Sequence, residues 1–265
     1  MTHRLLPISD GVAARLRGTP LVVMLDVDGT LAPIAQRPED AAVPPETRRL
    51  VAALTARPGV TVALVSGRAA ADARRMVSVA NAWVIGNHGY EILGPDGEEL
   101  VDPQNASYRS TVAQASRRLA GQVAPVRGVI LEDKGWTLSI HYRLADPGVV
   151  PRLRTTIEET IKPFGLRLTT GKQVFEVRPP ARVDKGTAVL TLGLKLGAFR
   201  DEGAVLFVGD DATDEDAFRA LRARTPRAVT VRVTHDEARP TAAELEVGSP
   251  AEVRDLLEWL IDSRG

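Results

Sequence analysis

The chain has 265 residues, of which 44% are hydrophobic and 26% charged, the balance of a soluble globular protein. Basic and acidic residues both number 34, so the formal net charge is zero and the sequence lacks a global signature of nucleic-acid binding. The absence of cysteine excludes disulfides, thiolate zinc sites and cysteine nucleophiles.

Apolar runs in the sequence are short. Leu21–Leu25 is typical and is far below the ~18 residues that a membrane-spanning helix needs. The first ten residues lack the long apolar stretch of a signal peptide. We therefore expect a cytoplasmic protein that binds neither membranes nor nucleic acid.

Strand and helix signals alternate in the first hundred residues. The unbroken apolar run Leu21–Leu25 predicts a strand buried on both faces. Pro44–Ala56 is expected to be a helix, with proline in the first turn and apolar residues at helical spacing. We expect a second strand at Val60–Val65, a helix at Ala69–Val77 and a third strand at Trp83–Ile85. This order predicts a doubly wound, parallel α/β sheet.

The middle of the chain has a different pattern. A hairpin is expected over Tyr90–Val101, with its turn at Pro95–Gly97. Some later strands alternate polar and apolar residues, as in a sheet with one wet face. We expect residues 103–182 to form an inserted, smaller α+β domain. Its elements are helix Tyr108–Leu119, strands Val129–Glu132 and Thr137–Tyr142, helix Val149–Lys162, and strands Leu166–Thr170 and Val174–Val177.

The last part of the chain returns to the first pattern. We expect it to join residues 1–102 in one core domain that also includes residues 183–265. The expected elements are helix Lys185–Leu196, strand Val205–Val208, helix Asp214–Arg222, strand Val229–Val233 and helix Val253–Ile261.

The segment Asp26–Leu31 directly follows the first buried strand, at the end where open α/β sheets bind ligands. Asp26 and Asp28 leave the strand on the same side, and they repel unless a cation lies between them or one takes a proton. Their oxygens suit magnesium, one carboxylate can attack phosphorus, and the other can transfer protons. Gly29 lets backbone amides approach a phosphate, and Thr30 offers a hydroxyl. The alternative is a polar turn that caps a helix.

Two further positions are suited to phosphate. Ser66 follows the second buried strand, at a predicted helix amino end where free amides and the helix dipole favour anions. It could also be a helix N-cap, and the two roles are compatible. Lys185 begins a predicted helix and could neutralise a transferred phosphoryl group. The alternative is a solvated surface lysine.

Five acidic residues lie within residues 210–216, directly after a predicted strand. An acidic helix start, favoured by the helix dipole, explains Glu215 and Asp216. It does not explain Asp210 and Asp211 at the strand tip, where repulsion requires a cation. We interpret this pair as a metal ligand and its support.

Four motifs in chain order resemble those of haloacid-dehalogenase-type (HAD) phosphatases: Asp26–Leu31, Ser66, Lys185 and the acidic cluster Gly209–Asp214. The insert corresponds to that superfamily's C2-type cap. The resemblance covers nearly the whole chain and implies a Rossmann-like HAD core. It implies that Asp26 is the nucleophile and that Asp28 is the general acid/base. It also implies that Mg²⁺ is bound by Asp26, by Asp210 and by the backbone carbonyl of Asp28. Lys185 would act in catalysis and bind phosphate together with Ser66. Asp211 and Asp214 would support the metal shell.

Charged residues of the insert offer a sugar-binding chemistry. Sugar hydroxyls both donate and accept hydrogen bonds, so Glu132, Lys134 and Glu176 could clamp a sugar. The alternative is a set of cross-strand ion pairs on a wet sheet face. The segments that carry these residues, Leu131–Arg143 and Gly171–Pro179, together with Gly86–Glu91 resemble those of trehalose-6-phosphate phosphatases. That resemblance implies sugar contacts from Glu132, Lys134 and Glu176, and further substrate contacts from Arg68, Asn87 and His88.

The implied reaction is hydrolysis of trehalose 6-phosphate to trehalose and phosphate through an aspartyl phosphate, in trehalose biosynthesis. A trehalose-6-phosphate synthase is then a candidate pathway partner. The alternatives are a phosphatase of sucrose 6-phosphate or of a mannosyl-glycerate phosphate, a sugar phosphomutase, a signalling receiver, and an inactive binding domain. Receivers lack an acid two residues after the acceptor and have no insert. An inactive domain is expected to lack one of Asp26, Asp28, Lys185 and Asp210, and the sequence retains all four.

Overall fold

The computed structural model describes residues 3–35, 40–100, 105–171, 173–180, 183–235 and 239–264. The chain divides into two compact units. The first unit combines Met1–Leu100 with Val183–Gly265, and the second is Val101–Arg182. The predicted domain boundaries at residues 102–103 and 182 lie outside the described residues.

A central sheet forms the first unit, with the strand order β1-β12-β11-β10-β2-β3-β4-β5. Neighbouring strands are parallel, except that β5 is antiparallel to β4. The strands are β1 (His3–Arg4), β2 (Leu21–Asp26), β3 (Val60–Val65), β4 (Trp83–Gly86), β5 (Glu91–Leu93), β10 (Ala204–Gly209), β11 (Val229–Val233) and β12 (Leu245–Val247).

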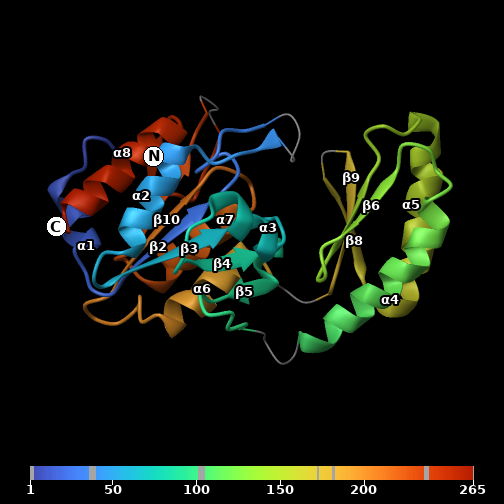
Figure 1. Ribbon diagram of the computed structural model, residues 1–265, viewed down its shortest axis with the longest axis horizontal. Helices are drawn as coiled ribbons and strands as arrows, with labels where there is room; N and C mark the ends of the chain where they lie inside the picture. Colours follow the sequence, from blue (N-terminus) through green and yellow to red (C-terminus); the bar gives the residue numbers. More distant parts are fainter. Residues whose placement is uncertain are drawn as a thin grey trace. The chain divides into compact units, whose positions relative to one another are not determined.

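Helices cover both faces of this sheet (Figure 1). Along β2, Val23 and Leu25 belong to the core cluster on one face, and Val22 and Met24 to the cluster on the other. Each of these fully buried side chains contributes roughly 1.5–3 kcal/mol by its removal from water. The predicted doubly wound α/β fold is confirmed. The first face packs against α1 (Asp10–Leu16), α2 (Pro45–Thr55), α3 (Ala70–Val77) and α8 (Pro250–Asp262), and the second against α6 (Lys185–Lys195) and α7 (Asp214–Arg224).

The predicted hairpin is present over its described part. Leu93 forms an antiparallel bridge with Glu99, and the amide of Leu100 donates to the carbonyl of Ile92 at 2.8 Å. Gly97 supplies the positive φ of the turn, at +81°. Helix α1, the edge strand β1 and its neighbour β12 were not predicted from the sequence.

The second unit has a four-stranded antiparallel sheet of order β6-β7-β9-β8 and two long helices. One sheet face packs against the helices through Leu138, Ile140, Phe175 and Val177, and Figure 1 shows both helices on that side. The residues between them face away, which explains the alternating pattern of these strands. The elements are α4 (Ala106–Val123), α5 (Val150–Ile161), β6 (Ile130–Asp133), β7 (Leu138–His141), β8 (Arg167–Gly171) and β9 (Val174–Arg178).

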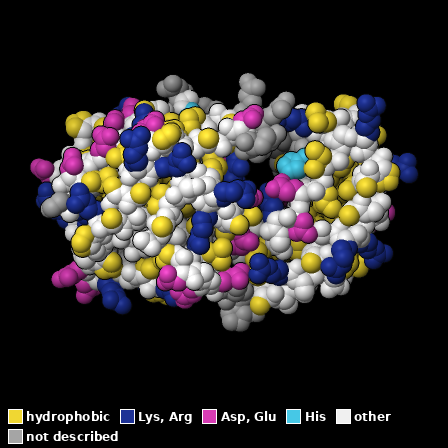
Figure 2. Space-filling model, in the orientation of Figure 1, with side chains coloured by type: hydrophobic (Ala, Val, Ile, Leu, Met, Phe, Trp, Pro, Cys, Tyr) yellow, Lys and Arg dark blue, Asp and Glu magenta, His cyan; other side chains and the backbone are white. Residues whose placement is uncertain are grey.

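The surface of the first unit carries both signs of charge. On the face that Figure 2 shows, basic and acidic side chains are interspersed among apolar ones. A search of the described residues finds no helix with the length and apolar content to span a membrane.

Candidate active site

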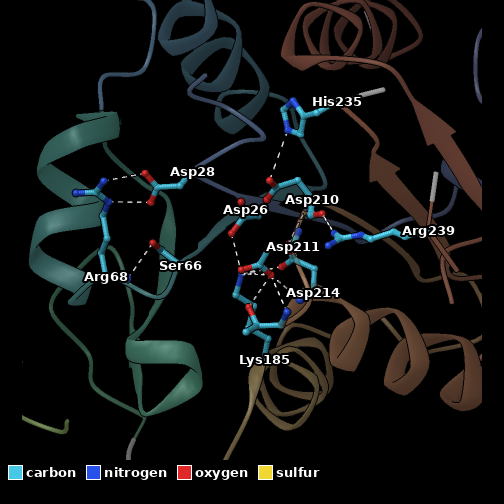
Figure 3. A network of polar contacts seen from close by, with 11 residues as sticks. Asp26, Asp28, Ser66, Arg68, Lys185, Asp210, Asp211, Asp214, His235 and Arg239 are labelled. Carbon is cyan, nitrogen blue, oxygen red and sulfur yellow. Dashed lines mark hydrogen bonds and ion pairs between the residues drawn. The ribbon is translucent and has the colours of Figure 1, made fainter. Parts of the chain in front are cut away.

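The predicted catalytic residues gather at the carboxyl ends of three adjacent parallel strands. Asp26 is the last residue of β2, Asp210 directly follows β10, and Ser66 directly follows β3. Because β10, β2 and β3 are neighbours in the sheet, these side chains reach one edge (Figure 3). This is the edge at which doubly wound sheets bind ligands.

Lys185 lies at the centre of the cluster. Its Nζ donates to Oδ1 of Asp26 at 2.8 Å and to Oδ1 of Asp214 at 2.7 Å. The side chain is only 2% exposed, so the reading as a solvated surface lysine is wrong. Burial lowers the pKa of Lys185, but Asp214, Asp26 and Asp211 outweigh that effect and hold it well above its usual value. Lys185 therefore stays protonated.

The carboxylates of the cluster have strongly perturbed pKa values. Burial raises the pKa of Asp26 well above its ordinary value, and the acids around it raise it further against the attraction of Lys185. Burial also raises the pKa of Asp210 to about 7 and that of Asp214 to about 6. Full ionisation of this cluster near neutral pH is therefore favoured by an additional cation.

The oxygen atoms present fit a divalent metal ion. Asp26, Asp210 and Asp214 each offer a carboxylate oxygen, and these oxygens lie within 4.8 Å of one another. Within the described part of the chain, Oδ2 of Asp26 and Oδ1 of Asp210 are buried without a hydrogen-bond partner. Leaving a buried acceptor unpaired costs about 1–3 kcal/mol, and Mg²⁺ prefers oxygen ligands of this kind.

Asp214 and Asp211 hold the loop between β10 and α7. Oδ2 of Asp214 accepts the amides of Asp210 and Asp211 at 2.9 and 3.0 Å, so both Asp214 oxygens are engaged. Oδ1 of Asp211 accepts the amide and hydroxyl of Thr213, each at 2.7 Å. Burial raises the pKa of Asp211, but Lys185 and these hydrogen bonds lower it to about 2. The two acids thereby place Asp210.

Two glycines make room for acidic side chains of the site. Gly29 has a φ of +84°, and a Cβ there would lie 2.1 Å from Oδ2 of Asp210. A Cβ on Gly209 would lie 2.4 Å from Cγ of Asp214. A side chain at position 29 would separate the segment after β2 from Asp210, and one at position 209 would displace Asp214.

The predicted phosphate-binding hydroxyls are both buried in the first unit. Thr30 is fully buried, and its Oγ1 has no hydrogen-bond partner among the described residues. Oγ of Ser66 accepts the amide of Arg68 at 3.1 Å, which leaves its own proton to donate. The N-cap of α3 is Ala69, so the reading of Ser66 as a helix N-cap is wrong.

Arg68 pairs with the predicted acid/base. Its Nε and Nη2 donate to Oδ2 and Oδ1 of Asp28, both at 2.8 Å. Figure 3 shows this pair in parallel, fork-to-fork geometry. The predicted substrate contact of Arg68 stays a prediction.

Asn87 and His88 lie in the turn after β4, against the loop that carries Ser66 and Arg68. The amide of Asn87 donates to the carbonyl of Arg68 at 2.7 Å, and the amide of His88 donates to the carbonyl of Ser66 at 3.1 Å. A Cβ on Gly67 would lie 2.5 Å from Cε1 of His88, so the imidazole packs directly over this glycine. The structure therefore brings these two residues to the loop that carries Ser66 and Arg68.

The three predicted sugar-binding residues, Glu132, Lys134 and Glu176, come together on the polar face of the second sheet. Nζ of Lys134 lies 3.9 Å from Oε2 of Glu132 and 4.0 Å from Oε1 of Glu176. Ser139 donates to Oε1 of Glu176 at 2.7 Å, and Nε2 of His141 lies 2.9 Å from Oε2 of Glu132. Sugar binding by this trio stays a prediction, because ion pairing alone also accounts for these contacts.

Sequence reasoning missed two residues beside Asp210. Nε2 of His235 lies 3.5 Å from Oδ2 of Asp210, and Nη2 of Arg239 donates to its backbone carbonyl. Both follow β11, which is adjacent to β10. Its place after that predicted strand, at the same edge of the sheet, is the signal that could have found His235.

Comparison with known proteins supports the same interpretation. A family model described as trehalose-phosphatase matches residues 24–251. A trehalose-phosphate phosphatase of Mycobacterium avium is 34% identical over 95% of this chain and 65% of its own length. An uncharacterized glycosyl hydrolase of Mycobacterium tuberculosis is 36% identical over 92% of this chain and 18% of its own length. The chain thus spans less than two thirds of these relatives.

Solved structures share the fold. The crystal structure of a trehalose-6-phosphate phosphatase related protein has a TM-score of 0.75 and 26% identity, covering 91% of this chain and 97% of its own. The C-terminal domain of the Candida albicans trehalose-6-phosphate phosphatase has a TM-score of 0.72 and 23% identity, covering 99% of this chain and 98% of its own. These proteins have the HAD fold, as predicted from the motifs. The chain belongs to the trehalose-phosphatase family.

Proposed function

We propose that this chain is a magnesium-dependent phosphatase that hydrolyses trehalose 6-phosphate to trehalose and phosphate. The observation that carries the proposal is the buried Asp26 carboxylate, bonded to Lys185 on one oxygen and lacking a partner among the described residues on the other. Relatives named trehalose-phosphate phosphatase support the choice of substrate.

In the first step, a carboxylate oxygen of Asp26 attacks phosphorus and the bond from phosphorus to the sugar oxygen breaks. Asp28 gives its proton to the departing sugar oxygen, because an alkoxide is a poor leaving group. Lys185, Ser66 and Thr30 hold the phosphoryl oxygens during this transfer. The products of the step are trehalose and an aspartyl phosphate on Asp26.

In the second step, water attacks the phosphorus and Asp28 takes the proton that the water loses. The bond from phosphorus to Asp26 breaks, which releases phosphate and restores the free carboxylate. When bound by Asp26, the backbone carbonyl of Asp28 and Asp210, Mg²⁺ would offset the negative charge that phosphate adds to the carboxylates. Asp211 and Asp214 support this arrangement through the loop contacts described above.

Removal of divalent metal should abolish activity, because the acids of the cluster cannot receive a phosphate dianion without a cation. Phosphate release is measured with excess chelator and again after Mg²⁺ is added, which should restore the rate. Asp210→Asn should weaken Mg²⁺ binding in calorimetry by at least about tenfold, since one unpartnered carboxylate becomes an amide. Asp216→Asn is the matched control, because Asp216 is exposed and paired with Arg219. Full activity in excess chelator would contradict the proposal.

The choice of sugar is proposed to depend on Glu132, Lys134 and Glu176. Replacing any one of them with alanine removes a hydrogen bond to a sugar hydroxyl, which costs roughly 1–3 kcal/mol when the partner stays buried. The kcat/KM for trehalose 6-phosphate should fall by about ten- to a hundredfold, and that for p-nitrophenyl phosphate much less.

Glu158→Ala is the control for this series, because Glu158 forms an exposed ion pair with Arg154 in the same unit. Equal losses on both esters would show that the trio stabilises the second unit instead. No loss on either ester would leave the trio as ion pairs on a polar sheet face.

Other glycosyl phosphates are the competing substrates. Phosphate release from sucrose 6-phosphate, a mannosyl-glycerate phosphate and glucose 6-phosphate, compared with trehalose 6-phosphate, separates these cases. Cytoplasmic location and a pathway link to a trehalose-6-phosphate synthase stay predictions.

A further inference from the structure

Arg68 and Asp28 form a bidentate ion pair between two neighbouring strand ends. Asp28 lies two residues after β2, and Arg68 three residues after β3. Nε of Arg68 donates to Oδ2 of Asp28, and Nη2 of Arg68 donates to Oδ1, each at 2.8 Å. Among the described residues, Arg68 is the sole hydrogen-bond donor to this carboxylate. The orientation of the Asp28 carboxylate therefore depends on the Arg68 guanidinium.

The backbone of Arg68 is itself held in place on both sides. Its amide donates to Oγ of Ser66 at 3.1 Å, and its carbonyl accepts the amide of Asn87 at 2.7 Å. The guanidinium is planar and presents its donors in a fixed fork, so a fixed backbone and two parallel bonds restrict both carboxylate oxygens. Each oxygen keeps a second lone-pair site, at which it can hold or accept a proton while it stays paired.

We propose that Arg68 is a positioning residue that orients the Asp28 carboxylate toward the oxygen of the leaving group. This inference rests on the proposed phosphatase function and adds a residue to its proton-transfer step. A misplaced acid loses much of its effect even when its chemistry is intact, because proton transfer needs hydrogen-bond geometry. Loss of Arg68 should therefore resemble a partial loss of Asp28.

The leaving group supplies a readout that a purely structural role would not change. Departure of p-nitrophenolate needs little help from an acid, that of phenolate needs more, and that of a sugar alkoxide needs most. In Arg68→Ala, kcat/KM should fall about tenfold or more on trehalose 6-phosphate, less on phenyl phosphate and by less than about threefold on p-nitrophenyl phosphate. Neither aryl ester contains a sugar, so a difference between them cannot come from a lost sugar contact.

A double-mutant cycle tests whether Arg68 acts through Asp28. Asp28→Asn and the double variant Asp28→Asn with Arg68→Ala should have the same kcat/KM on trehalose 6-phosphate, because no acid is left to position. Arg68→Lys keeps the charge but not the fork, and its activity should lie between those of wild type and Arg68→Ala. Arg75→Ala is the matched control, because Arg75 pairs with Asp72 on the exposed side of α3. Thermal unfolding of each variant identifies any loss of fold.

Three results would overturn the inference while wild-type activity stands. An equal effect on the two aryl phosphates would show a direct contact of Arg68 instead, with phosphate if both rates fall and with sugar if neither does. Additive losses in the cycle would show that it acts apart from Asp28. Unchanged activity of a folded Arg68→Ala on trehalose 6-phosphate would show that the ion pair is dispensable. Wild-type protein without phosphatase activity would instead overturn the proposed function, and this inference with it.

Discussion

Asp26→Asn should lower the turnover of trehalose 6-phosphate by at least about 10³-fold. The amide is a poor nucleophile and a poor metal ligand, so the substitution removes two functions from one buried position. The change preserves the volume of the side chain, so the fold should persist. Steady-state phosphate release gives the rate, and unfolding by denaturant shows whether the variant is folded.

A second acid of the same protein provides the control for this substitution. Asp216 lies in the acidic run after β10, yet it is exposed and pairs with Arg219 at 2.8 Å. Asp216→Asn should keep the activity of the wild type. An Asp26→Asn variant with activity within tenfold of the wild type would remove Asp26 as the nucleophile.

Lys185→Met should abolish activity and also destabilise the protein. The methionine has a similar length but no charge, so Asp26 and Asp214 lose the ammonium that they share in the interior. Removing one partner of a buried ion pair costs about 3–5 kcal/mol, because the remaining charge is left uncompensated. The free energy of unfolding should fall by about that amount in denaturant titrations.

Lys195→Met on the same helix is the matched control for the stability measurement. Lys195 pairs with Glu98 at 2.7 Å, but both side chains are exposed, and such pairs contribute about 0–1 kcal/mol. The two variants thus separate the effect of a buried charge from that of a surface charge. Equal stability of Lys185→Met and wild type would contradict the described role of Lys185.

The sequence predicted the sheet and much of the site for one physical reason. A strand buried on both faces is an unbroken apolar run, and the residue after such a run lies at the ligand-binding edge. Asp26, Ser66 and Asp210 could be placed there without knowledge of any contact. Edge strand β1 has no such signal, because its two residues are exposed and the strand exists only through its pairing with β12.

Side-chain pairing across loops could not be predicted in this way. The bond from Arg68 to Asp28 depends on rotamers and on two loops that meet only in three dimensions. Burial of Lys185 was equally hidden, since a lysine at a helix start is usually solvated. Helix α1 has seven residues, too few for a clear period, although its N-cap Ser9 was a local signal.

The pairing of β2 with β10 has a consequence for the order of folding. Leu21 lies opposite Ala204, so the middle of the sheet joins two segments that are separated by the whole inserted unit. A nascent chain that ends before α6 leaves one edge of β2 open and Asp26 without Lys185 or Asp210. The inserted unit has its own hydrophobic core and is one continuous span of the chain, and contacts over a shorter span form faster than distant ones. The edge of the sheet that carries Asp26 is therefore completed late, when the C-terminal segment docks beside β2.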